Sequence, residues 1–222
     1  MTDHTHAAHP STTESGGSAA DAAFWDARYA EKTQIWSGQP NAVLVQEVSD
    51  LDPGTALDLG CGEGADAVWL ARRGWRVTAV DISQVALDRA AGHAADAGVA
   101  DRIEFLRCDL GETFPDGQFD LVCAQFLHSP TDMPREEILR SAAAAVAPGG
   151  DLLIAGHAKF PEGAHEDHHD MHLPTPQEVL ESLGLPDGEW EVLLSDEHER
   201  VHTWNDGTSV TRTDNALRVR RR

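Results

Sequence analysis

The middle of the chain alternates between short apolar runs and amphipathic runs. Five runs rich in apolar and β-branched residues have the length of strands: 55–60, 75–80, 102–108, 118–125 and 151–157. Three segments between them space their apolar residues as helices do: 64–74, 83–98 and 134–147. Strands that alternate with helices pair in parallel, with crossover helices on both faces of the sheet. This part of the chain is therefore predicted to form a doubly wound α/β sheet.

Both ends of the chain depart from this alternation. Residues 1–20 are rich in Ser, Thr, Gly and His, and are predicted to be a disordered tail. A helix is predicted at 21–32, and a second helix is predicted to open at Pro40, because proline suits the first helical turn. Residues 21–222 are then expected to form a single domain, since they show no internal repeat and no second core.

The C-terminal part predicts a helix at 174–184 and then two more strands, 190–203 and 209–220. Between these strands lies Asp206-Gly207, a dipeptide typical of hairpin turns. The predicted fold is a doubly wound, mostly parallel, seven-stranded Rossmann-like sheet with an antiparallel C-terminal hairpin. The last residues, RVRRR, are expected to continue the final strand into a frayed tail.

A glycine-rich turn follows the first predicted strand, in the stretch LDLGCGEGADAVWL. Gly60, Gly62 and Gly64 provide unusual backbone dihedral angles and allow a ligand to approach the backbone closely. A nicotinamide dinucleotide site would need the third glycine at position 65, which is alanine. The spacing therefore does not fit a dinucleotide.

Acidic residues follow the next two strands. Asp81 ends the second strand, 21 residues after Gly60, where a carboxylate can accept hydrogen bonds from both hydroxyls of a ribose. After the third strand, Asp109 and Leu110 are placed to bind an adenine amino group and cover its ring. Carboxylates at three strands, Asp58 included, would repel a pyrophosphate. S-adenosylmethionine has adenine, ribose, an amino acid and a sulfonium, but no phosphate, and fits this pattern.

Several ordered motifs between about Trp25 and Gly156 resemble those of the class I S-adenosylmethionine-dependent methyltransferases: LDLGCGEG, TAVDIS, RCDL and APGGDLLI. The segment WDARYAEKTQIWSGQPN is similar to the small-molecule branch that includes tellurite-resistance and thiopurine methyltransferases. The resemblance implies a transferase that uses S-adenosyl-L-methionine. It also implies cofactor contacts at seven positions: Asp58, Gly60, Gly62, Asp81, Ile82, Asp109 and Leu110.

Some of these residues have a structural interpretation as well. Ile82 is equally suited to the hydrophobic core, and Asp58 can orient the glycine turn through backbone N–H groups. Trp25, Tyr29 and Trp36 either cover the cofactor or pack an aromatic helix face on the sheet. Trp36, beside Ser37-Gly38, is the favoured lid residue.

Residues after the fourth strand are expected to face the transferred methyl group, because that strand borders the topological switch point. Gln125 is assigned to the cofactor's amino group, with capping of the strand as the alternative. His128 is the candidate catalytic residue, as a base or an acceptor-orienting group, because it is the only titratable side chain of the run 124–128. The alternative is an exposed loop histidine. A base is needed only for a nucleophile that arrives protonated with a high pKa, since the leaving group is neutral.

Histidines gather between the fifth strand and the next helix. His165 with His169, and His168 with His172, are four apart, a spacing that suits metal ligation on a helix. Prolines and a glycine in this segment oppose a helix, so a rim of the acceptor pocket is expected and no metal. His157 is expected either to reach the same pocket or to be buried and hydrogen-bonded. The tail histidines 4, 6 and 9 are expected to be solvated.

The net charge and the cysteine spacing limit the classes of binding partner and the cellular location that are expected. The formal net charge of −21 disfavours nucleic acid and anionic membranes. The three cysteines show no C-x-x-C spacing and residues 1–20 lack the apolar core of a signal peptide, so a cytoplasmic location is expected. The predicted function is methyl transfer to a small-molecule acceptor, with a thiol or other soft nucleophile favoured. The alternatives are a non-catalytic S-adenosylmethionine-binding module and an NAD-dependent oxidoreductase.

Overall fold

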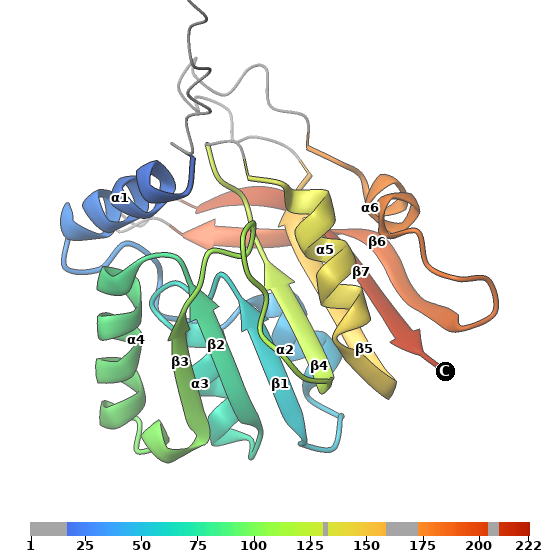
Figure 1. The fold of residues 1–222 in the computed structure, drawn as a ribbon, viewed down its shortest axis with the longest axis horizontal. Helices are drawn as coiled ribbons and strands as arrows, with labels where there is room; N and C mark the ends of the chain where they lie inside the picture. Colours follow the sequence, from blue (N-terminus) through green and yellow to red (C-terminus); the bar gives the residue numbers. More distant parts are fainter. Residues whose placement is uncertain (1–16, 131–132, 159–172, 204–208) are drawn as a thin grey trace, which may run out of the picture.

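The computed structural model describes residues 17–130, 133–158, 173–203 and 209–222. Its centre is a seven-stranded sheet with the order β3-β2-β1-β4-β5-β7-β6 (Figure 1). The strands are β1 Thr55–Leu59, β2 Arg76–Asp81, β3 Ile103–Arg107, β4 Phe119–Gln125, β5 Val146–His157, β6 Trp190–Thr203 and β7 Ser209–Arg221. The first five pair in parallel, and β7 is antiparallel to both β5 and β6. The predicted fold class is confirmed.

Helices cover both faces of the sheet, with α5 and α6 in front of it and α2 and α3 behind it in Figure 1. The α-helices are α1 Gly17–Ala30, α2 Ala42–Val48, α3 Ala65–Arg72, α4 Gln84–Asp96, α5 Arg135–Ala144 and α6 Pro176–Leu183. A short 3-10 helix, Ala100–Arg102, precedes β3. Successive side chains of a strand point to opposite faces, and β1 follows this rule. Ala56 joins the core with α2 and α3, whereas Leu57 and Leu59 join the core with α5 and α6.

Side-chain caps mark the start of three of the six described α-helices. Ser83 begins α4 as predicted, because its hydroxyl accepts a hydrogen bond from Ala86 N. Thr175 and Glu178 form a reciprocal capping box at the start of α6. The expectation for Pro40 is wrong: Asn41 is the N-cap of α2, with its side chain accepting from Val43 N, so Pro40 lies before the helix. The Asn41 side chain provides an acceptor for a free N–H group of the first helical turn, and a proline side chain has no such acceptor.

The predicted N-terminal tail and the predicted C-terminal hairpin are each only partly covered by the described residues. Helix α1 begins at Gly17, inside the range assigned to the tail, while residues 1–16 lie outside the described part. The expected hairpin turn at Asp206-Gly207 also lies outside it, although the antiparallel pairing of β6 with β7 is confirmed. Within the described residues, no helix has both the length and the apolar character needed to cross a membrane.

The C-terminal arginines are paired rather than frayed. Asp151 on β5 is buried, and its carboxylate accepts from Arg218 Nη2 at 2.7 Å and from Arg220 Nε at 2.8 Å. Both arginines lie on β7, the neighbouring strand, where Arg220 is directly opposite Asp151. A buried carboxylate needs such partners, because desolvation without pairing is very costly. The strand predicted over 209–220 is confirmed and continues to Arg221, whereas the frayed end expected after it is wrong, because Arg222 N donates to Glu189 O.

Replacing Asp151 with asparagine should lower the free energy of unfolding by about 3 kcal/mol, because two arginines would lose their shared counter-ion. Chemical denaturation measures this change. Glu104→Gln, on the exposed face of β3, is the control and should change stability by less than about 0.5 kcal/mol. Equal stability of the two variants would contradict the structural role of the pair.

Candidate cofactor and acceptor site

The glycine turn lies at the carboxyl end of β1 and is packed closely by other segments. Gly60 and Gly62 have φ angles of +70° and +54°, in the left-handed region that favours glycine. A Cβ atom on Gly60 would lie 2.8 Å from Leu127 Cδ1, and one on Gly62 would lie 2.9 Å from Tyr29 Oη. The turn therefore contacts both the loop after β4 and helix α1, and neither glycine has room for a side chain.

Asp81 joins this turn to the end of β2. Its Oδ2 accepts a hydrogen bond from Gly62 N at 2.8 Å, and its Oδ1 accepts from Ser83 N at 2.9 Å. Burial raises the pKa of Asp81 to about 6. An ionised carboxylate has about four lone-pair sites, so two remain for hydroxyl donors of a ligand.

One alternative for Asp58 was that it orients the glycine turn by accepting from backbone N–H groups. The Gly62 N–H donates to Asp81 instead. The Asp58 Oδ2 atom is buried and has no hydrogen-bond partner among the described residues. Burial, followed by the negative charges of Asp66 and Asp81, raises the pKa of Asp58 well above its usual value. Asp66 itself has a pKa raised by burial to about 6. Two buried carboxyl groups, Asp58 and Asp81, and the half-buried Asp66 thus lie around one turn.

Glu63 holds the segment after α1, at Ile35 and Trp36, over the glycine turn. This carboxylate is buried and accepts from Ile35 N and Trp36 N, while it forms an ion pair with Arg89 at 2.9 Å. Trp36 Nε1 donates to Tyr29 Oη at 3.0 Å, and the Trp36 residue is 51% exposed. The structure therefore brings a fixed but half-exposed indole beside Gly62, where a lid residue is expected. Sequence reasoning missed Glu63, although an acid between two turn glycines was a visible signal.

Helix α1 crosses the carboxyl ends of the strands (Figure 1) rather than a sheet face. Asp26 accepts from Ser83 Oγ at 2.6 Å and lies 3.6 Å from Arg107, which ends β3. Trp25 Nε1 donates to Ser129 Oγ, in the loop after β4. The helix thus closes the edge where a ligand of a doubly wound sheet binds.

The residues predicted for the adenine side are spread along this edge. Ile82 is half-buried, and its carbonyl accepts from Arg107 Nε. Asp109 Oδ1 accepts from Gly111 N within its own loop, at 2.9 Å. Leu110 is partly buried and packs against the core under α5. The contacts expected between these side chains and an adenine ring remain predictions.

Gln125 ends β4 with a buried amide group. Neither Oε1 nor Nε2 has a hydrogen-bond partner within the described residues, so its side chain does not cap the strand. A buried amide left unpaired is unfavourable, which indicates that a ligand supplies the partners. The next residue, Phe126, has φ of +53°, the single positive value among the described non-glycine residues. Such strain is typical of functional sites.

His128 lies inward, so the alternative of an exposed loop histidine is wrong. Its Nε2 atom is buried and has no hydrogen-bond partner in the part of the chain that the structure describes, and its ring stacks on that of His157 with ring centroids 5.9 Å apart. Burial, with the positive charge of Arg135 and with His157, lowers the pKa of His128 to about 4. His157 is half-buried, its Nδ1 lies 3.3 Å from buried Asp214, and it lines a cavity beside His128.

This cavity lies between the ends of β5 and β7, helix α6 and the start of α5. Its lining includes His128, Arg135, Gly156, His157, Val179 and Asn215. The free space has roughly the size of one water molecule. Asn215 Oδ1 is also buried without a hydrogen-bond partner in the described part of the chain. Sequence reasoning missed Arg135 and Asn215, because neither belongs to a motif.

No metal site is formed by His, Cys, Asp and Glu side chains of the described residues. The histidine pairs of the segment 159–172 lie outside that part, as do His4, His6 and His9. The expectations for them stay untested.

Comparison with known proteins agrees with this geometry. Residues 56–150 match the family model described as "Methyltransferase domain". A curated relative is the 2-heptyl-1-hydroxyquinolin-4(1H)-one methyltransferase of Mycobacteroides abscessus, 32% identical over 65% of this chain and 66% of that protein. The chain spans less than half the length of several other curated relatives.

Solved structures share the fold over most of the chain. One is the protein studied for conversion of a disulfide bond into a thioacetal group during echinomycin biosynthesis: its TM-score is 0.67 at 23% identity, over 90% of this chain and 91% of that one. Another is TehB from Haemophilus influenzae, with a TM-score of 0.63 at 17% identity, over 91% of this chain and 67% of that one. On its sequence motifs, its fold and its domain match, the chain belongs to the class I methyltransferases, whose methyl donor is S-adenosylmethionine.

Proposed function

We propose that this protein transfers a methyl group from S-adenosylmethionine to a small-molecule acceptor. The observation that carries the proposal is the group of carboxyls around the glycine turn, made of buried Asp58 and Asp81 and half-buried Asp66. Asp66 and Asp81, whose pKa values of about 6 leave them mostly ionised at pH 7, oppose a pyrophosphate and favour a ligand with a positively charged sulfonium and ammonium. The named activity of the relative from Mycobacteroides abscessus, on a hydroxyquinolinone, supports a small-molecule acceptor.

The proposed cofactor contacts follow the geometry of this edge. Asp81 accepts hydrogen bonds from the ribose hydroxyls, Gln125 pairs with the amino acid part, and Trp36 covers the bound molecule. Asp109 and Leu110 lie on the adenine side. The remaining contacts, made through the backbone or the shape of the turn, are Asp58, Gly60, Gly62 and Ile82.

The reaction is an in-line displacement at carbon. The acceptor's electron pair forms the new bond to the methyl group, and the pair of the broken C–S bond stays on sulfur, which becomes a neutral thioether. The residues of this chain have to align the acceptor and exclude water. His128 is neutral at pH 7 and a weak base, because its pKa is lowered to about 4. This favours an acceptor that arrives deprotonated, such as a thiolate.

A soft acceptor also fits the structural neighbour of echinomycin biosynthesis, whose described chemistry takes place at sulfur. The three cysteines of this chain are free, which supports the proposal of a cytoplasmic location. Small-molecule acceptors are proposed as the partners, without nucleic acid or membrane.

Calorimetric titration with S-adenosylmethionine and with NAD tests the cofactor, and only the first is expected to bind. Methyl-labelled S-adenosylmethionine, incubated with a panel of thiols, phenols, amines and metalloid oxyanions, tests the activity. We expect label on thiols first. Tight binding with transfer to no member of the panel would favour a non-catalytic binding module, and binding of NAD alone would favour an oxidoreductase.

Replacing His128 with glutamine tests its catalytic role. A general base at position 128 would give an about hundredfold lower kcat for a phenol at neutral pH after this replacement, and a much smaller loss for a thiol that ionises by itself. Because its pKa of about 4 makes His128 a weak base, we expect instead similar and modest losses for both acceptors, with unchanged affinity for S-adenosylhomocysteine. The two acceptors are compared by initial rates on the same variant, and equal losses for both would argue that His128 orients the acceptor instead.

A further inference from the structure

Arg135 is the side chain at the acceptor cavity whose charge the proposed reaction leaves unexplained. It is the first residue of α5, and its Nε donates to Leu127 O at 3.0 Å. Burial lowers the pKa of the Arg135 guanidinium, although it stays charged at neutral pH. Among the described residues no carboxylate forms an ion pair with it, in contrast to Arg89, Arg218 and Arg220.

The missing ion pair is not due to a shortage of acidic residues. The chain has 38 Asp and Glu against 17 Lys and Arg. A largely buried cation without a counter-ion is costly, and charges of this kind are usually paired. An unpaired guanidinium on a cavity therefore indicates that a ligand provides the negative charge.

The surroundings of Arg135 complete a site for such a group. His128 and Asn215 line the same cavity, and neither His128 Nε2 nor Asn215 Oδ1, both buried, has a hydrogen-bond partner among the residues that the structure describes. A side chain on Gly156 would lie 3.2 Å from His128 Nε2 and 4.0 Å from Arg135 Nη2, so its absence keeps this end of β5 open between the two groups. The cavity holds about one water molecule, which suits the charged end of a ligand rather than a whole molecule.

We propose that the methyl acceptor carries a carboxylate or a similar oxyanion, and that Arg135 is its counter-ion at the end of β5. His128 Nε2 donates a hydrogen bond to the oxyanion in the tautomer that carries its proton there, and Asn215 Oδ1 accepts from a neighbouring donor of the acceptor. The oxyanion anchors the acceptor, and the nucleophile is a separate atom directed toward Gln125. This inference rests on the proposed function and narrows its substrates to small organic acids.

The test uses two probes of nearly the same size and shape, the negatively charged 3-mercaptopropionate and the neutral 3-mercaptopropionamide. Their affinities are measured by calorimetry on the full chain saturated with S-adenosylhomocysteine. We expect the acid to bind about tenfold more tightly than the amide, as one charge-assisted hydrogen bond provides. Arg135→Gln should remove this difference, and Arg135→Lys should restore part of it, while the affinity for S-adenosylhomocysteine stays unchanged.

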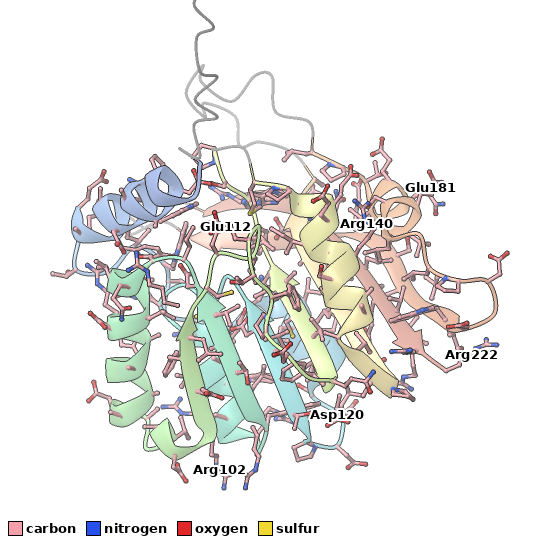
Figure 2. All side chains as sticks on the ribbon, in the orientation of Figure 1. Arg102, Glu112, Asp120, Arg140, Glu181 and Arg222 are labelled. Atoms are coloured by element: carbon pink, nitrogen blue, oxygen red, sulfur yellow. The ribbon has the colours of Figure 1, made fainter. Side chains whose placement is uncertain are left out.

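Arg140→Gln is the matched control. Arg140 lies on the same helix but on its outer face (Figure 2), where its side chain is 45% exposed and lies 3.7 Å from Glu136. This variant should bind both probes as the unchanged protein does. Control and test variants lose the same charge, so a difference between them reports the position of the charge.

Equal affinities of the two probes for the unchanged protein would overturn the proposal, and so would failure of the acid to bind. Undiminished binding of the acid by Arg135→Gln would also overturn it. If that variant loses structure, the comparison of acid with amide on the unchanged protein still decides. Failure of S-adenosylhomocysteine to bind would instead refute the proposed function, so the two failures are distinguishable.

Discussion

Replacing Asp81 with alanine is expected to lower the affinity for S-adenosylmethionine by about a hundredfold. Two hydrogen bonds from ribose hydroxyls to a carboxylate are worth about 3 kcal/mol together, which corresponds to that factor. Asp81 also accepts from Gly62 N and Ser83 N, so the variant loosens the glycine turn as well. Calorimetric titration of the folded variant measures the loss.

Asp120→Ala is the control for this variant. Asp120 lies at the opposite end of the sheet, near the amino end of β4 (Figure 2), where its carboxylate accepts a hydrogen bond from Thr55 N at 2.7 Å. Its loss should affect stability but leave cofactor affinity unchanged. Cofactor affinity of Asp81→Ala equal to that of the control would refute the assignment of Asp81 to the ribose.

The raised pKa of Asp81 adds a pH dependence to this result. With a pKa of about 6, most Asp81 carboxyls are protonated at pH 5, and cofactor affinity should fall by about tenfold between pH 7 and pH 5. The Asp81→Ala variant should lack this part of the dependence. For stability the sign is opposite: the folded pKa lies above the ordinary value of 3.8, so the contribution of Asp81 to unfolding free energy rises as pH falls from 6 toward 4.

Replacing Gly62 with alanine should abolish measurable cofactor binding and destabilise the fold by about 2 kcal/mol or more. The new Cβ would lie 2.9 Å from Tyr29 Oη and 3.3 Å from Trp36 Nε1, and would displace the segment that covers the turn. The alanine would also have to adopt the left-handed backbone conformation of Gly62, which costs about 1–2 kcal/mol by itself. Titration with S-adenosylhomocysteine and thermal unfolding measure the two effects.

Gly98→Ala separates the two causes. Gly98 has φ of +68°, and a Cβ atom there would contact nothing within 4 Å. This control should show the backbone cost alone, with normal cofactor binding. If both variants bound the cofactor equally well, close packing at Gly62 would have no part in the site.

The order of elements could be predicted because it depends on local properties. Alternating apolar runs, the glycine turn at 60–64 and the N-cap Ser83 each act within a few residues, and all appear in the structure. Predictions failed where the position of a side chain depends on a residue that is distant in sequence. The final strand was predicted over 209–220, but not the pairing of its arginines Arg218 and Arg220 with Asp151, because Asp151 is more than sixty residues away in sequence. Pro40 was misplaced by one competing local signal, the cap at Asn41.

The candidate site divides in the same way. Asp81 and the turn glycines were found because they follow strands, and all carboxyl ends of parallel strands meet at one edge. His128 was found as a titratable residue after a strand, but its inward position, low pKa and stacking on His157 could not be read from neighbours in sequence. Arg135, Glu63 and Asn215 belong to no motif.

The amino-acid sequence alone determined the doubly wound sheet, the family and the strand edge at which cofactor binding is proposed, because turn chemistry and hydrophobic period are encoded within short segments. Only the tertiary structure decided which polar groups are buried without partners. Burial and pairing depend on segments that are distant in sequence, as Gln125 and His128 illustrate: within the described residues their buried polar atoms have no hydrogen-bond partner. The acceptor site proposed here rests on such groups rather than on the motifs.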